Sequence, residues 1–216
     1  MALSPQRLQQ KRAKKAALRR KAHAPAHVHG SPSASINTGR NWENGLSSPI
    51  HEVFVNENIF AGGMGTLVYC RRTADMQHIV SMFLLDTYCL GVKNVVQSVM
   101  SAEQFAVLKM QLERSHNSGF IPMPPPKARK LLEELVAWSR NLGFEPAADY
   151  GDAVRILNDT PLDDSSLAFE FGAQGKPFYI AGPRDSLAKS KRIIDQLAKK
   201  CGEGGFEYMI SPTGGF

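Results

Sequence analysis

Three β-favouring runs, separated by two short loops of hairpin type, occupy residues 50–93 and constrain the fold more than any other part of the chain. They cover residues 50–56, residues 66–72 and residues 78–88. β-Branched and aromatic residues recur in them, as is typical of strands joined by short turns. The third run is the most hydrophobic, and apolar side chains fall on both of its faces. We therefore expect this strand to lie inside a sheet, with helices on at least one face.

The loop of residues 61–65 contains three glycines and invites comparison with phosphate-binding loops. Such loops lead from a strand into a helix N-terminus, whereas this loop leads into a further β-favouring run. We interpret it as a turn or bulge in which a glycine takes positive φ.

Helical patterns and a second β-rich segment follow. The helices are expected at residues 101–115, 127–141, 149–157 and 186–201. Ser101 and Gln104 form a capping box, and Asp185 is the expected N-cap of the last helix. Around a turn at residues 172–176 we expect a hairpin of strands 167–171 and 177–181, with a final strand at residues 206–210. Since strands and helices come in blocks, the fold class is α+β, with a mainly antiparallel sheet from the two β-rich segments packed with about four helices.

Charge is distributed unevenly along the chain. Residues 1–40 carry nine of the 26 Lys and Arg residues and none of the 20 Asp and Glu residues, so the remainder carries 17 basic and 20 acidic residues. We divide the chain into a basic N-terminal arm (residues 1–40), a linker (residues 41–49) and an α+β globular domain (residues 50–216).

The arm has the composition of a polyanion-binding segment. Its cluster of eight basic residues consists of Arg7, Lys11, Arg12, Lys14, Lys15, Arg19, Arg20 and Lys21. The residue types favour a helix, but like charges four residues apart oppose it and no apolar face could bury it. We expect disorder in the free arm and helix on a bound polyanion. A membrane surface would require the missing apolar face, so the pattern favours nucleic acid, RNA ahead of DNA. The alternatives are a solvated tail and a mitochondrial transit peptide.

The three cysteines, Cys70, Cys89 and Cys201, are odd in number and lie far apart. They predict free thiols in a reducing compartment, by default the bacterial cytoplasm. No apolar run reaches the length of a membrane span, so we expect no membrane partner. We also expect no cofactor and no metal. The nearest approach to a metal motif is the group His23, His27 and His29 in a segment without periodicity.

At residues 86–93 the hydrophobic third run abruptly carries Asp86, Tyr88, Cys89 and Lys93. A carboxylate at the end of a buried strand must find donors or cations. It could take part in catalysis. The favoured interpretation is a cap, in which Asp86 accepts backbone N–H groups from the turn at residues 90–92. The spacing of polar residues predicts no catalytic dyad or triad.

Several segments resemble a family of uncharacterised bacterial proteins. They are the Lys/Arg/Ala-rich start, FLLDTYCLGVKN, LGFEP at the end of a helix, GKPFYIAGPRDS and GGFEYMI. The resemblance runs over nearly the whole chain, and FLLDTYCLGVK is its most specific part. It implies that the arm and the domain recur as one unit, and it carries no activity or catalytic residue with it.

Two functions fit these patterns. The first is a non-enzymatic accessory protein that binds RNA, with ribosomal RNA as one candidate, through its arm, while the domain docks a protein or an RNA feature. The second is a small enzyme with its site at residues 86–93, in which the arm serves only localisation.

Overall fold

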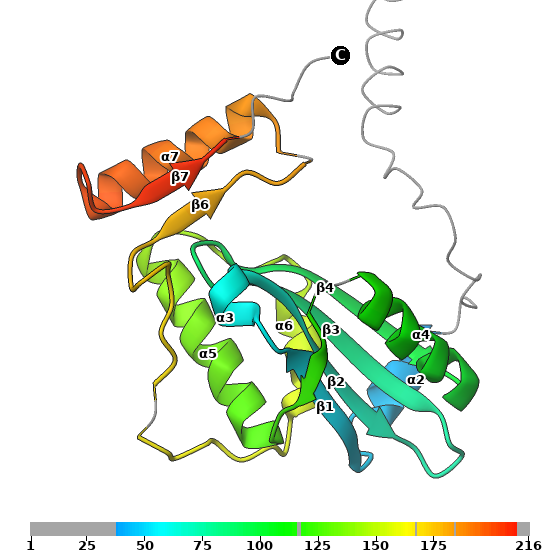
Figure 1. Ribbon diagram of the computed structural model, residues 1–216. Coiled ribbons are helices and arrows are strands. Elements are labelled where there is room, and N and C mark those ends of the chain that lie inside the picture. The colour runs from blue at the N-terminus through cyan, green and yellow to red at the C-terminus, as the bar shows by residue number, and fades with distance from the viewer. Residues whose placement is uncertain (1–37, 116–117, 167, 184, 211–216) are drawn as a thin grey trace, which may run out of the picture. The chain divides into compact units, whose positions relative to one another are not determined.

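The computed structural model describes residues 38–115, 118–166, 168–183 and 185–210, and its architecture is α+β, as predicted (Figure 1). The strands are β1 (Ile50–Asn56), β2 (Met64–Arg72), β3 (His78–Asp86), β4 (Gly91–Met100), β5 (Phe120–Pro122), β6 (Phe178–Ile180) and β7 (Glu207–Met209). The helices are α2 (Thr38–Gly45), α3 (Ile59–Gly62), α4 (Ala102–Ser115), α5 (Pro125–Asn141), α6 (Tyr150–Ala153), the 3-10 turn η1 (Val154–Leu157) and α7 (Leu187–Cys201). The eight basic residues of the arm and its three histidines lie outside the described residues.

Strands β1 to β5 form one antiparallel sheet in the order β4-β3-β2-β1-β5. β1 to β4 pair with their neighbours in the chain, so short turns suffice to connect them. β3 is paired on both sides, as its hydrophobicity predicts. Gly63, in the turn before β2, has a φ of 72° and confirms the predicted turn. The sequence pattern does not predict β4, because Lys93, Asn94 and Gln97 interrupt its apolar residues.

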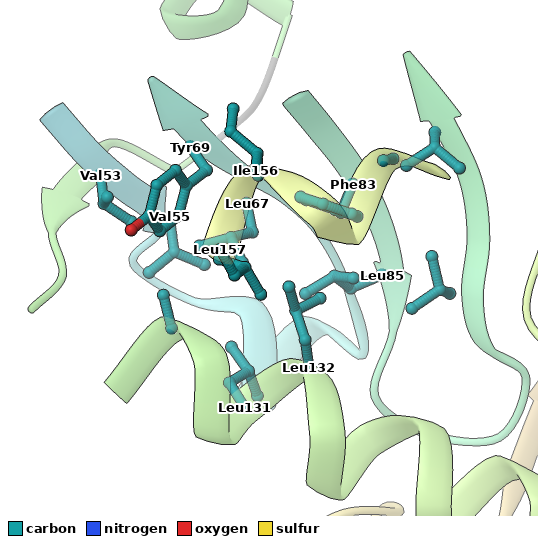
Figure 2. Packing of buried hydrophobic residues seen from close by; sticks show 14 of the residues in the cluster. Val53, Val55, Leu67, Tyr69, Phe83, Leu85, Leu131, Leu132, Ile156 and Leu157 are labelled. Carbon is teal, nitrogen blue, oxygen red and sulfur yellow. The ribbon is translucent and has the colours of Figure 1, made fainter. Parts of the chain in front are cut away.

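Both faces of the sheet carry a hydrophobic core. On one face Val55, Leu67, Phe83 and Leu85 meet Leu131 and Leu132 of α5 and Ile156 and Leu157 of η1 (Figure 2). On the other face Phe105 of α4 packs with Val68 and Val80. The two faces thus divide the side chains of β3 as their alternation predicts. Full burial of one such leucine stabilises the fold by about 1.5–3 kcal/mol, so α5 is held mainly by this packing.

Helix α2 overlaps the segment expected to be a linker. Its Trp42 is 6% exposed, and so is Leu46, which follows its last residue; both belong to the core of the α5 face. Two apolar residues four positions apart are enough to anchor one helical turn, although they make no pattern long enough to predict a helix. The packed domain therefore includes residues N-terminal to β1. Within the described ranges, no helix is both long and apolar enough to cross a bilayer.

Within the same packed domain, the second β-rich segment forms a two-stranded sheet apart from the large one. β6 and β7 pair in parallel, with α7 connecting them. Residues 168–171 are not a strand, so the predicted hairpin is wrong. Only Ala173 and Lys176 bridge across its turn. Phe169 and Phe171 instead join an aromatic cluster with Phe60. This β6–α7–β7 unit packs on Cys89 and Leu142 through Tyr179, Leu197 and neighbouring apolar residues.

Candidate functional site

The segment at residues 86–93 forms the turn between β3 and β4. Asp86 ends β3, where it pairs with Gly91, and it is 4% exposed. Its Oδ1 accepts hydrogen bonds from the backbone N–H groups of Cys89 at 2.9 Å and Tyr88 at 3.2 Å. Lys93 Nζ lies 3.8 Å from Oδ2. The carboxylate therefore caps the turn, as predicted, although these hydrogen bonds come from Tyr88 and Cys89, which precede the expected donors at residues 90–92.

The electrostatic balance at Asp86 agrees with a structural role. Burial raises the pKa of this carboxyl group, and Lys93 together with the N–H groups of Cys89, Leu90 and Tyr88 partly offsets that effect. The N–H bonds are short, whereas the contact with Lys93 is at the outer limit of an ion pair. Main-chain donors consequently provide most of the close contacts to the charge.

The residues beside Asp86 fasten the turn to two other loops. Thr87 is buried, and its Oγ1 donates to the carbonyl of Ile59 at 3.0 Å. The N–H of Thr87 donates to Gly63 at 2.8 Å, and its carbonyl accepts from Gly172 at 2.9 Å. The hydroxyl of Tyr88 donates to the carbonyl of Ala61 at 2.5 Å. The turn is therefore held by the α3 loop and by the residues that precede β6.

Cys89 is unsuited to nucleophilic chemistry in this position. The side chain is fully buried among Leu142, Tyr179, Ile193 and Leu197. This burial is the largest cause of the raised pKa of the thiol. A nucleophilic cysteine needs the opposite, an accessible thiolate with a lowered pKa. All three cysteines are free, as the sequence predicts.

A hollow of about 440 Å³ lies beside the turn but is not lined by the candidate residues. Its walls come from Phe60, Ala61, Ala168, Phe169, Glu170, Gly172 and Gln174. Asp86, Cys89 and Lys93 are absent from this lining. The structure thus places the four candidates around one turn, and none of them lines this hollow.

The turn connects the large sheet with the β6–α7–β7 unit through packing and hydrogen bonds. Cys89 and Leu90 pack against the unit, the carbonyl of Tyr88 accepts from the N–H of Phe178 at 3.2 Å, and the two rings stack at 5.9 Å. Gly91 has a φ of 72°, and a Cβ at this position would lie 2.4 Å from Ser139 Oγ of α5. The close packing explains why this segment combines polar, aromatic and glycine residues.

The most deeply buried charge of the described residues is Arg71, which is not among the candidate residues predicted from the sequence. It is 0% exposed in β2. Its Nε donates to the carbonyl of Ile156 at 2.7 Å and its Nη1 to the carbonyl of Ser48 at 2.6 Å, while Nη2 pairs with Asp159. An Arg inside the apolar run of β2 was the available signal, but its partners lie far away in the sequence.

Across the described part of the chain, no group of three or more His, Cys, Asp or Glu side chains could hold a metal ion. Comparisons of the sequence with family models and with characterised proteins, and of the fold with solved structures, yield no match. The resemblance based on FLLDTYCLGVK stays a prediction.

Proposed function

We propose that this chain is a non-enzymatic accessory protein that binds RNA through its basic N-terminal arm. The observation that carries the proposal is the separation of charge along the sequence. Eight Lys and Arg residues fall between Arg7 and Lys21, with no acidic residue in the first 40 positions, whereas the rest of the chain is slightly acidic. Such a segment binds phosphates through charge and carries little sequence preference of its own.

Support also comes from the groups on which an enzymatic function would depend. Asp86 is engaged by backbone N–H groups, the Tyr88 hydroxyl by a carbonyl, and Cys89 is sealed in a core. Each has a role in holding the turn, so none needs a reaction to explain its presence. The enzyme interpretation would require turnover that Asp86→Asn abolishes while folding persists.

The test compares the full chain with a chain lacking residues 1–36, a deletion that stops short of α2. Binding to unstructured single-stranded RNA is measured by fluorescence anisotropy at several salt concentrations. Eight basic residues engage roughly five to eight phosphates, which gives a slope of log K against log salt of about −4 to −6. The truncated chain should lose most of the affinity and most of the slope.

A matched control keeps the arm and removes only its charge, by changing the eight basic residues between Arg7 and Lys21 to Gln. It should behave like the truncation. A second control changes Lys199 and Lys200, exposed residues of α7, and should leave the slope nearly unchanged. If truncation leaves affinity and slope as they were, the arm is not the RNA contact. If the full chain shows no salt-sensitive binding, the solvated-tail or transit-peptide interpretation replaces the proposal.

A further inference from the structure

Free sheet edges invite pairing with other strands unless a structural device blocks them. β5, one edge of the large sheet, is three residues long and ends in Pro122. β4, the other edge, carries Lys93, has a bulge opposite Leu84 and Leu85, and its Val92 carbonyl accepts from Ala147. At the outer edge of β6, the Phe178 N–H donates to the turn of residues 86–93. Each of these three edges thus has at least one feature that opposes pairing with a further strand.

β7 is as short as β5, but the other protective features are missing from it. It contains neither Pro nor Lys, and its three residues are all exposed, with Tyr208 55% and Met209 56% exposed. The Glu207 N–H donates to Pro177 and the Met209 carbonyl accepts from Ala181, so both residues bond towards β6. Because successive residues of a strand direct their backbone groups to opposite sides, the N–H and C=O of Tyr208 face outward. Within the described residues they have no partner. Figure 1 shows β7, in red, on the side of β6 away from the large sheet.

We propose that β7 pairs in antiparallel orientation with β7 of a second copy of this chain, with Tyr208 on the two-fold axis. Tyr208 of each copy then exchanges both backbone hydrogen bonds with Tyr208 of the other, and the two rings become cross-strand neighbours. The result is a four-stranded sheet, β6-β7-β7-β6, built from two units that are each a single parallel pair. Isolated two-stranded sheets are marginal, and added strands stabilise them.

The side chains of the segment are complementary to themselves in this register. Glu207, its only charged residue, faces Met209 of the second copy, and Phe206 faces Ile210. No like charges meet, which a two-fold contact requires of a segment that pairs with itself. Glu207 also keeps its ion pair with Lys176, at 3.7 Å. A second copy is therefore the occupant that this edge fits.

The dimer is tested with the full chain in the absence of RNA, so the outcome does not depend on the proposed function. Sedimentation equilibrium over a range of protein concentrations should show a reversible monomer–dimer equilibrium. A chain that stays monomeric up to about 100 μM, where even a weak specific dimer forms, would overturn the proposal.

Two variants of one residue then test the register. Met209→Glu places like charges opposite Glu207 of the second copy, and it does so twice because of the two-fold axis. It should raise the dissociation constant about tenfold. Met209→Lys places opposite charges there and should leave the dimer at least as tight as the wild type. Met110→Glu changes a residue of similar exposure, 49%, on α4, and should have no effect. Equal weakening by Met209→Glu and Met209→Lys, with circular dichroism unchanged, would contradict the pairing.

Discussion

Asp86 and Arg71 are both buried charged residues, and most of their close contacts are with main-chain atoms. Backbone groups are fixed by the fold, so they bind a charge without the entropy loss of a mobile side-chain partner. In both cases the charged residue connects separate parts of the chain. Asp86 shapes the turn on which the β6–α7–β7 unit packs, and Arg71 ties β2 to η1 and to the residues before β1.

Asp86→Ala should lower the free energy of unfolding by about 0.5–2 kcal/mol, the range of a lost cap. Asp86→Asn should cost less, because a side-chain carbonyl in the place of Oδ1 can still accept both backbone N–H groups and no charge has to be buried. Chemical denaturation measures both values, with the exposed Asp164→Ala as control. Nearly unchanged stability in both variants, with loss of an activity or a ligand, would instead support the chemical interpretation of this residue.

Arg71→Met should destabilise the domain by roughly 2–4 kcal/mol, because it leaves the buried carbonyls of Ile156 and Ser48 without their donors. The adjacent Arg72 is exposed, so Arg72→Met is a control of the same chemistry and should change stability by less than about 0.5 kcal/mol. A similar loss in both variants would mean that general charge, and not the bonds of Arg71, is responsible.

At the scale of elements, the domain depends on close approaches between turns and helices. Gly91→Ala adds a Cβ 2.4 Å from Ser139 Oγ at a position with positive φ. We expect a loss of about 1–3 kcal/mol, measured by thermal and chemical unfolding. Gly62→Ala serves as the control, because nothing lies within 4 Å of the added atom and α3 is helical there. If Gly91→Ala leaves the free energy of unfolding unchanged, α5 shifts easily, and the contact between Gly91 and Ser139 is less tightly packed than its geometry indicates.

The contact between β1, β3 and α4 should make stability depend on pH. The His78 ring stacks on Phe105 at 4.8 Å and lies 5.0 Å from His51. Burial lowers the pKa of both imidazoles, and Arg72 contributes to the shift. Since the folded-state pKa values lie below that of the unfolded chain, only the unfolded state gains protons as the pH first falls below about 6.5. The free energy of unfolding should therefore decrease there.

The double variant His51→Gln, His78→Gln isolates this effect. The raised pKa of Asp86 acts in the opposite direction, because its folded state takes up the proton first, but it is present in both proteins. Denaturation at several pH values between about 5 and 7 should give a smaller slope for the double variant. Identical slopes would show that the two histidines do not titrate differently in the folded and unfolded states.

At the scale of the whole molecule, the three hydrophobic clusters draw their residues from positions 42–206. We therefore expect the chain lacking residues 1–36 to unfold cooperatively, with a melting temperature close to that of the full chain. Calorimetry tests this expectation. A broad transition would mean that the arm contributes to the packed domain. If the β7 dimer forms, each particle carries two arms, and RNA long enough to reach both should bind more tightly than the single-arm affinity.

Sequence alone determined the parts of this protein that depend on near neighbours in the chain. The apolar face of α5 predicts that helix because its residues repeat with helical period, and the alternation in β1 to β3 predicts those strands. The capping box of α4 forms as predicted, with Ser101 and Gln104 bonding to each other's backbone N–H groups. Charge alone likewise defines the arm. The predicted cap of α7 is wrong by one residue, because Ser186 caps the helix, while the Asp185 carboxylate accepts from the N–H of Gly182.

The tertiary structure decided the features that depend on distant contacts. Arg71 finds partners 85 and 88 residues further along the chain, so the neighbouring sequence does not show which groups satisfy its charge in the core. α2 is held by its packing on the core. The parallel pairing of β6 with β7 arises because α7 carries the chain back to the end of the sheet where β6 begins. The turn of residues 86–93 looks reactive in the sequence because it gathers an acid, a phenol, a thiol and an amine. In the fold those groups point to different partners, since a turn that joins two packed units must satisfy its polar atoms on every side.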